Sequence, residues 1–229
     1  MKLRDHAWNR YSQYGEDGII DQICKDLYLP SYGTCGEFGA ADGFFCSNTA
    51  ALWEAGWEAL LIEPNGDLMP ALHDNTASYP NVTVKCLYVN DVDECYPEPL
   101  TILSMDVDGN EPYLLEKMEV RHRVLVVEHN PTVPPDYEMI GPRDTLTGAS
   151  ALSLTKIAES KGYRLIAATD TNLFFVVEED FDCFEDYDTD LDSIFVRTHL
   201  NYVITNYVGG YQEIGPFPYG KVQEEVLIP

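Results

Sequence analysis

The chain has 229 residues, of which 45% are hydrophobic and 12% aromatic, and it carries a formal net charge of −25 from 39 acidic and 14 basic residues. Length and composition are typical of one globular domain with a single sizeable core, and the charge disfavours nucleic acid and anionic membranes as partners. No apolar run is long enough to cross a bilayer, and residues 1–10 have no secretory signal pattern, so we expect a cytoplasmic protein that acts on a neutral, cationic or metal-bound substrate.

Along the chain, short continuous apolar runs alternate with runs of helical spacing. The continuous runs predict buried strands over residues 34–40, 59–62, 82–89, 100–105 and 124–127. The helical spacing predicts helices over residues 18–29, 47–55, 67–73, 112–118 and 150–160. This alternation favours an α/β fold in which a mostly parallel sheet has helices on its faces.

The pattern changes after residue 160. Residues 163–168 and 173–177 predict two strands joined by the polar turn 169–172, which indicates a late antiparallel hairpin. We expect one domain over residues 1–180, including an N-terminal helix and lid. The remaining residues, 181–229, predict an acidic and aromatic extension of irregular structure packed on the same domain.

Six cysteines are spread along the chain without a CxxC pair. Without a secretory signal they predict free thiols, since disulfides are rare in the cytoplasm, and the spacings of a zinc site are absent.

Ligands of open parallel sheets bind at the carboxyl ends of the strands, so the residues that follow each expected strand form the candidate site. The first strand ends in Glu37-Phe38-Gly39-Ala40-Ala41-Asp42-Gly43, where the glycines allow a tight turn close to a ligand. The second ends in Glu63, whose two oxygens can accept both ribose hydroxyls of an adenosine ligand. The alternative is two ordinary turns with solvated carboxylates.

Hard oxygen ligands follow the fourth and fifth expected strands. These are Asp106, Asp108 and Asn110 on one side and Glu128 and Asn130 on the other. Such ligands can hold Mg²⁺ or another divalent cation, which would lower the pKa of a substrate hydroxyl and orient it. Alternatively, Asp106 contacts only cofactor or substrate, and Asp108 and Asn110 cap the next helix.

His129 alone among the five histidines lies at an expected strand end. Its intrinsic pKa suits a general base, and a buried histidine that only satisfies a hydrogen bond is an equal alternative.

Four segments in this order resemble the FkbM-like family of S-adenosylmethionine (SAM)-dependent methyltransferases, and the resemblance covers residues 11–178. The segments are Ser12–Gly18, Glu37–Gly43 with Ser47-Asn48-Thr49, Gly56–Pro64, and Ser104–Asn110 with Val127–Asn130. The resemblance implies a Rossmann-like class I methyltransferase fold with a seven-stranded sheet. It implies an enzyme that transfers the methyl group of SAM to a hydroxyl of a sugar or other small molecule.

The resemblance also assigns residues. It implies that the cofactor contacts Gln13, Glu37, Gly39, Asp42, Asn48, Glu63, Asn90, Asp91 and Asp106, with Asn90 and Asp91 near the adenine. It places Asp106, Glu128 and either Asn130 or His129 as metal ligands are placed in catechol O-methyltransferase-type enzymes. Asp106 and His129 are the candidates for removing the hydroxyl proton.

Three other functions stay open. Asp106-Val107-Asp108 is a DxD sequence of the kind found in metal-dependent nucleotide-sugar glycosyltransferases, but that function leaves Glu63 and the glycine turn unexplained. An NAD-dependent oxidoreductase would also use Glu63, but the first turn lacks GxGxxG. A non-catalytic methyltransferase-like scaffold is the third, and the carboxylates at the strand ends argue against it.

Overall fold

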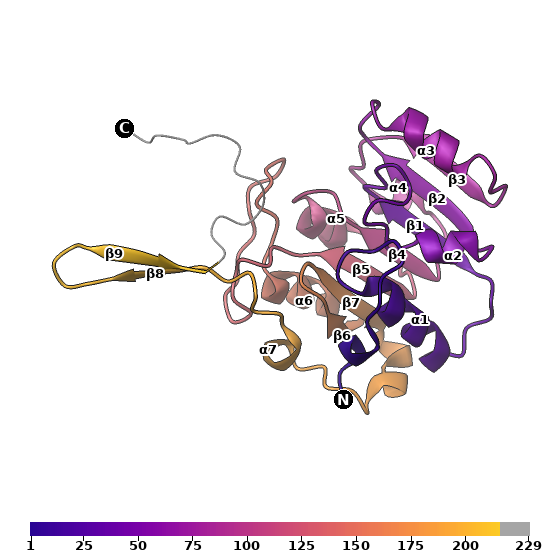
Figure 1. Cartoon of the computed structure of the whole chain (residues 1–229). Helices are drawn as coiled ribbons and strands as arrows, with labels where there is room; N and C mark the ends of the chain where they lie inside the picture. The colour runs from indigo at the N-terminus through magenta and orange to yellow at the C-terminus, as the bar shows by residue number, and fades with distance from the viewer. Residues whose placement is uncertain (216–229) are drawn as a thin grey trace.

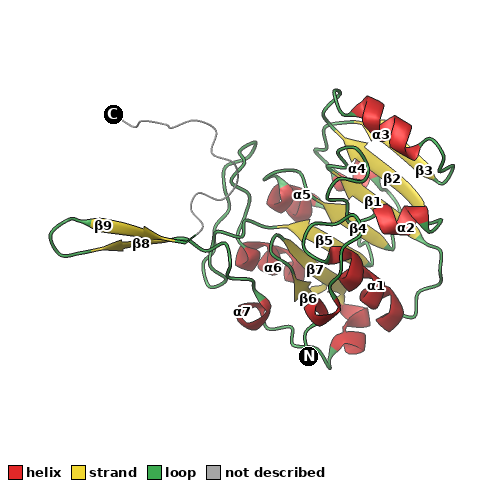
Figure 2. Cartoon of the chain, in the orientation of Figure 1, coloured by secondary structure: helices red, strands yellow, loops and turns green. Residues whose placement is uncertain are grey.

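The computed structural model describes residues 1–215, with the backbone alone for residues 212–214. A seven-stranded sheet lies between two layers of helices (Figures 1 and 2). Its strands are β1 (Thr34–Phe38), β2 (Glu58–Glu63), β3 (Val82–Cys86), β4 (Ile102–Met105), β5 (Val124–Glu128), β6 (Tyr163–Ala168) and β7 (Asn172–Val177). Their order is β3-β2-β1-β4-β5-β7-β6. β7 runs antiparallel to both of its neighbours, and the other pairings are parallel.

Each face of the sheet buries its own apolar core. Along β5, Val124 and Val126 belong to one core, and Leu125 and Val127 belong to the other. Successive side chains of a strand point to opposite faces, so a strand covered on both sides reads as a continuous apolar run. The first core packs under α1 (Glu16–Asp26), α2 (Ala50–Glu54) and α3 (Met69–Thr76), and the second under α4 (Val92–Cys95), α5 (Glu111–Lys117), α6 (Ala151–Ser160) and α7 (Leu191–Ile194).

The predicted parallel sheet and late hairpin are confirmed, with element ends shifted by a few residues. The short helix α4 was not predicted, because its apolar residues are too few to show a period. All six cysteines are free. Within the described residues, no helix combines the length and the apolar character that crossing a bilayer requires.

The C-terminal extension has two parts. Between residues 184 and 200, the buried side chains are those of Phe184, Ile194, Phe195, Val196 and Leu200. Irregular structure was expected over the later residues, and this is wrong for residues 202–214, because β8 (Tyr202–Thr205) and β9 (Tyr211–Ile214) form an antiparallel hairpin. Residues 216–229 lie outside the described residues. The hairpin projects from the body (Figure 1), and the β8 side chains are exposed instead of packing on the domain.

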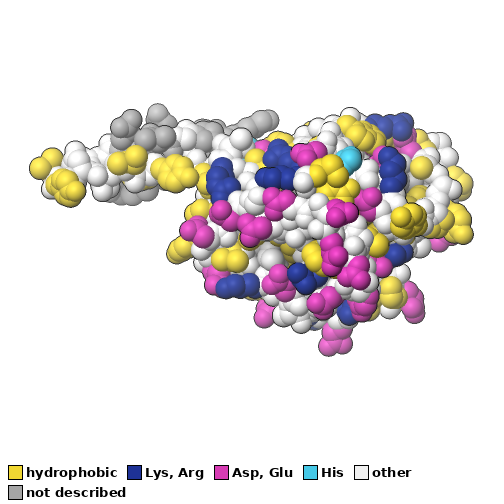
Figure 3. Space-filling model, turned by 90° about the horizontal axis from the view of Figure 1, so that it is seen from below, with side chains coloured by type: hydrophobic (Ala, Val, Ile, Leu, Met, Phe, Trp, Pro, Cys, Tyr) yellow, Lys and Arg dark blue, Asp and Glu magenta, His cyan; other side chains and the backbone are white. Residues whose placement is uncertain are grey.

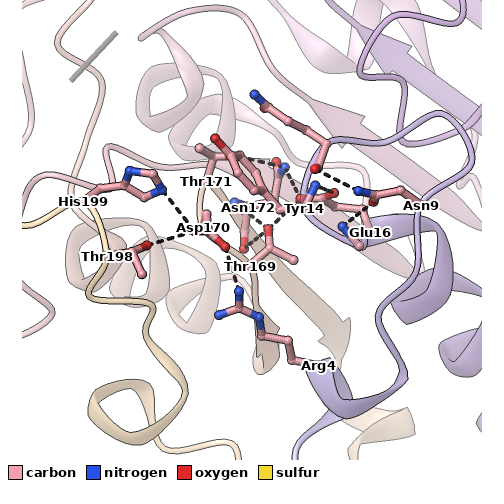
Figure 4. Close-up of polar contacts among 12 residues, drawn as sticks. Arg4, Asn9, Tyr14, Glu16, Thr169, Asp170, Thr171, Asn172, Thr198 and His199 are labelled. Carbon is pink, nitrogen blue, oxygen red and sulfur yellow. Dashed lines mark hydrogen bonds and ion pairs between the residues drawn. The ribbon is translucent and has the colours of Figure 1, made fainter. Parts of the chain in front are cut away.

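The turn between β6 and β7 contacts both the N-terminal segment and the start of the C-terminal extension (Figure 4). Glu16 is fully buried, and its Oε1 accepts hydrogen bonds from Thr169 Oγ1 at 2.7 Å and Asn172 Nδ2 at 3.1 Å. Asp170 lies 2.8 Å from Arg4 Nη2 and 3.0 Å from His199 Nε2. The start of α1 and the C-terminal extension are therefore fixed against the same turn.

Candidate active site

Two cavities open at the carboxyl edge of the sheet, where the strand order reverses between β1 and β4. The β1/β4 cavity has a volume of about 390 Å³, and the β4/β5 cavity beside it has a volume of about 490 Å³. Asp108 lines both. Two neighbouring cavities of this size suit two small ligands that meet at one point.

Gly39 shapes the first turn of the β1/β4 cavity. It adopts a left-handed φ of +75°, and a Cβ at this position would lie 1.9 Å from the carbonyl oxygen of Asp106. Ala41 and Cys46 also have positive φ, at 48° and 55°, which is uncommon without glycine. The predicted tight turn is thus present, and it brings the backbones that follow β1 and β4 into contact.

Glu63 lies where the sequence places it, at the end of β2 and in the lining of the β1/β4 cavity. It is buried, and each carboxylate oxygen accepts one backbone hydrogen bond. Oε2 accepts from the Ala41 N–H at 2.8 Å, and Oε1 accepts from the Asn65 N–H at 2.7 Å. A carboxylate oxygen has two acceptor lone pairs, so one on each oxygen stays open to a ligand.

Glu37 also lines the β1/β4 cavity, but its oxygens hold the segment that leads into α2. Oε2 accepts from the hydroxyls of Ser47 and Thr49 at 2.7 and 2.6 Å, and Oε1 accepts from the Asn48 N–H at 2.8 Å. Burial raises the pKa of Glu37, and these hydrogen bonds oppose the rise. Asn48, in turn, donates through Nδ2 to Ser104 Oγ, so Glu37 and Asn48 fix the backbone around the cavity.

Asn48 and four other cofactor-binding candidates lie outside the described linings of the two cavities. Asp42 accepts from the N–H groups of residues 44 and 45 and so closes the turn. Asp91 caps α4 and pairs with Lys117 at 2.7 Å, and this partner lowers the pKa of Asp91. Gln13 and Asn90 are exposed. Contacts of these four with a cofactor remain predictions.

Asp106, Asp108 and Glu128 form a cluster of three carboxylates at the junction of the cavities. One oxygen from each lies within 4.8 Å of the others. Burial raises the pKa of Asp106 to about 6. Burial and the Asp106 charge raise the pKa of Glu128 well above its usual value. The three carboxylates therefore either share a proton or need a cation to offset their mutual repulsion.

Asn130, the third predicted metal ligand, is engaged elsewhere. Its Nδ2 donates to the Thr147 carbonyl at 2.8 Å, and its Oδ1 accepts from both N–H and Oγ1 of Thr132 at 2.9 and 2.6 Å. These bonds use both lone pairs of Oδ1. Asp108 therefore takes the third position in the cluster.

His129 lines the β4/β5 cavity and packs against Phe195, with a ring-centroid distance of 5.5 Å. Its ring nitrogens make no hydrogen bond of normal geometry, although the backbones of Asn130 and Thr169 lie beside the ring. Burial lowers the pKa of His129 to about 4. A base with so low a pKa accepts protons weakly at neutral pH, so this environment does not favour His129 as the general base.

Sequence reasoning missed two features. Glu111 lines the β4/β5 cavity, and burial raises its pKa to about 7; it follows Asp106 by five residues, so the acidic run itself could have indicated it. At the rim of the β1/β4 cavity, Tyr88 donates to Asp144 Oδ1 at 2.6 Å, and Asn110 Nδ2 donates to both. No sequence pattern indicates these three hydrogen bonds, since the residues that form them lie far apart in the chain.

No family model matches the sequence, and no similar curated protein was found. Solved structures do match. The citrinin polyketide synthase CMeT domain is 16% identical over 71% of this chain and 51% of that one, with a TM-score of 0.50. An S-adenosylmethionine-dependent methyltransferase from Clostridium acetobutylicum is 5% identical over 72% and 92% of the two chains, with a TM-score of 0.49. The N-terminal domain of EvdMO1, solved with SAH and D-fucose, is 12% identical over 71% and 82%, with a TM-score of 0.48.

At these identities the likeness concerns the fold. The chain spans about half the length of the CMeT structure, and the resemblance to the FkbM-like family stays a prediction. The likeness to the CMeT domain agrees with the strand order and with the antiparallel β7. The chain therefore has a Rossmann-like α/β fold with a seven-stranded, mostly parallel sheet.

Proposed function

We propose that this protein is a SAM-dependent methyltransferase that binds SAM in the β1/β4 cavity. The observation that carries the proposal is the charge of that cavity, which lies at the point where the strand order reverses. Glu37, Glu63, Asp106 and Asp108 line it, and the described lining residues include no lysine or arginine. SAM has a net positive charge, because its sulfonium and ammonium groups outnumber its one carboxylate, so a carboxylate-lined cavity attracts it.

The same negative charge favours the binding of SAM over the binding of NAD or a nucleotide-sugar. NAD and nucleotide-sugars carry a diphosphate, which four carboxylates without a basic partner repel. The DxD alternative would need a cation bound by Asp106 and Asp108 to reverse this repulsion. SAM binding needs no such ion.

The described residues also fit the shape of the ligand. Glu63 keeps one free lone pair on each oxygen for the two ribose hydroxyls. Phe45, Leu68 and Val89 supply apolar surface for the adenine. The close contact at Gly39 excludes a Cβ, so the backbone itself can lie against the ligand at this point.

We place the methyl acceptor in the β4/β5 cavity. Asp108, Glu111 and Glu128 line it, and no lysine or arginine is present among its described lining residues. An anionic acceptor is disfavoured by this charge. An amine would be held in its protonated form, which lacks the lone pair needed for attack. A neutral hydroxyl, of a sugar or another small molecule, meets neither obstacle.

The carboxylate cluster is the part of the site suited to handle the hydroxyl proton. Methyl transfer is an in-line displacement, so the protein mainly aligns the acceptor oxygen with the methyl group. Asp106 contacts the cofactor side, and Glu128 the acceptor side. Their raised pKa values suit a shared proton acceptor near neutral pH.

The donor set of the cluster also fits Mg²⁺, which prefers carboxylate oxygens. Asp106, Asp108 and Glu128 would hold the ion. Bound there, a divalent cation would supply Lewis acidity to the acceptor hydroxyl.

Calorimetry with four ligands tests the cofactor assignment. We expect the purified protein to bind SAM and S-adenosylhomocysteine, and not NADH or UDP-glucose. The UDP-glucose titration is repeated with Mg²⁺. Binding of UDP-glucose without binding of SAM would replace the methyltransferase with the glycosyltransferase.

Chelation tests the cation separately. With an acceptor found by screening neutral glycosides, we expect EDTA to reduce turnover strongly and to leave SAM affinity nearly unchanged. Undiminished turnover after exhaustive chelation would leave the Asp106–Glu128 pair as a metal-free proton acceptor.

A further inference from the structure

The hairpin of β8 and β9 with its turn, residues 202–214, is an arm that the proposed active site does not use. It forms a two-stranded sheet of its own. Along β8, Val203 is 65% exposed and Ile204 is 54% exposed. At the turn, Val208 is 91% exposed. Val203 and Ile204 point to opposite faces, so both faces of β8 are exposed within the described part of the chain.

The arm is a specified structure. Asn206 donates its N–H to the Gly210 carbonyl at 2.8 Å, and its Oδ1 accepts from the N–H groups of Val208 and Gly210 at 3.0 and 2.9 Å. Gly209 supplies the positive φ of 87° that the turn needs. The sequence therefore encodes a hairpin at this point, even though few other contacts hold it.

The arm and the body differ in charge. Residues 202–211 contain no charged side chain, and the arm has one carboxylate, Glu213, in a chain whose net charge is −25. Figure 3 shows hydrophobic side chains on the arm and many carboxylates on the body. An isolated two-stranded hairpin is marginally stable in water, and an uncharged strand edge is a template for pairing with another strand. These properties favour the pairing of a further strand with an edge of the arm.

We propose that the arm pairs with the arm of a second copy of this chain, β8 against β8, to form a four-stranded sheet across a two-fold axis. A two-fold axis places each copy of an edge strand antiparallel to its mate, so the surface complements itself. Tyr202–Thr205 has no charge to oppose such pairing.

The charge of the body limits where a second copy can bind. Two bodies of this charge repel each other, and a basic partner would be attracted to the acidic body more than to residues 202–211, which carry no charge. Because the arm projects (Figure 1), pairing at the arms keeps the two bodies apart. The inference is independent of the proposed methyltransferase activity.

Sedimentation equilibrium of the full chain provides the first test. We expect a dimer whose dissociation constant falls when NaCl is raised from about 0.02 M to about 0.5 M, because salt screens the repulsion between the bodies. A monomer at every protein and salt concentration would overturn the proposal.

The double variant Val203→Lys/Ile204→Lys locates the contact. Each lysine would face a lysine of the other copy, and like charges opposed across strands are destabilising. We expect a monomer with an unchanged circular dichroism spectrum and an unchanged thermal transition. The control Tyr32→Lys/Tyr137→Lys adds the same charge at two exposed aromatic residues of the body and should leave the dimer intact. A dimer that persists in the arm variant would refute pairing through β8.

Cross-linking gives a second, independent measurement. With all of β8 paired, residue 203 of one copy lies opposite residue 204 of the other, so Val203→Cys and Ile204→Cys proteins are mixed and oxidised in a Cys86→Ser/Cys183→Ser background, which removes the two exposed thiols. Side chains of paired strands lie about 4.5–5.5 Å apart, so the mixture should give a disulfide-linked dimer, and either variant alone should give much less. Failure of the mixture to cross-link would count against the two-fold pairing.

Discussion

The carboxylates of the first half of the carboxyl edge, around the β1/β4 cavity, and those of the second half, at the junction with the β4/β5 cavity, have different surroundings. Around the β1/β4 cavity, Glu37 and Glu63 accept hydrogen bonds from backbone N–H groups and hydroxyls within the fold. At the junction with the β4/β5 cavity, Asp106, Asp108 and Glu128 face one another without a basic side chain among the described residues that line the cavities.

This difference suggests that the two groups of carboxylates have different roles. Hydrogen-bond donors around a carboxylate stabilise its charged form, and the carboxylate in turn fixes the backbone around it. Carboxylates that face one another are costly unless a proton or a cation joins them. In the proposed function, we therefore expect the first half to be a rigid binding surface and the second half to take up a proton or an ion.

The largest effect is expected at the contact that joins the two halves. Gly39→Ala places a Cβ 1.9 Å from the Asp106 carbonyl at a φ of +75°. Left-handed strain and overpacking together should lower the free energy of unfolding by about 2–5 kcal/mol in urea titration. The control is Gly56→Ala, where φ is +99° and nothing lies within 4 Å of the added Cβ; it should lose only about 1–2 kcal/mol. Equal losses would show that the Gly39 contact is not tight.

Glu63 tests the binding surface of the first half. Glu63→Ala should weaken SAM binding about ten- to a hundredfold by calorimetry, because a buried charged acceptor is lost. Asp67→Ala removes an exposed carboxylate in the loop after β2 and serves as the control. An unchanged dissociation constant in folded Glu63→Ala would remove the ribose assignment.

Glu128 tests the second half through pH. Burial and Asp106 raise its pKa in the folded state, so the folded state binds the proton more tightly than the unfolded state does. Stability from this group is therefore present at low pH and falls as pH rises above its unfolded pKa of about 4.3. In chelator, Glu128→Gln should be more stable than the wild type by about 1–3 kcal/mol at pH 7. The difference should shrink toward about pH 4.

Adding Mg²⁺ to the same stability comparison tests whether the carboxylate cluster binds a cation. If the cluster binds the ion, Mg²⁺ should raise the thermal transition of the wild type more than that of Glu128→Gln. A Glu128→Gln variant that is less stable at neutral pH would contradict the unfavourable charge at this position.

The smallest effect is expected at Asp42. Its Oδ1 accepts from two N–H groups of its own turn, and the amide oxygen of asparagine can do the same. Asp42→Asn should therefore change the free energy of unfolding by less than about 0.5 kcal/mol and SAM affinity little. Asp42→Ala, which loses the acceptor, should cost about 1 kcal/mol. A tenfold loss of SAM affinity in Asp42→Asn would show that its charge contacts the ligand.

Much of the fold could be predicted from local patterns. Strands such as Val124–Glu128 are apolar throughout because both faces are covered, and the glycine turn after β1 follows from a backbone contact that excludes a Cβ. The arm could not be predicted, because the exposed and aromatic residues of β8 show no alternation toward a core.

The sequence by itself determined the order of strands and turns, and thus which residues follow each strand, because side-chain periodicity and glycine conformation act over a few neighbours. Only the tertiary structure decided which of those residues are free to act. Asn130 is engaged by Thr132 and Thr147, Asp108 completes the carboxylate cluster, and His129 is buried with a lowered pKa. Hydrogen-bond donors and burial come from segments distant in the chain, and residue type alone does not record them.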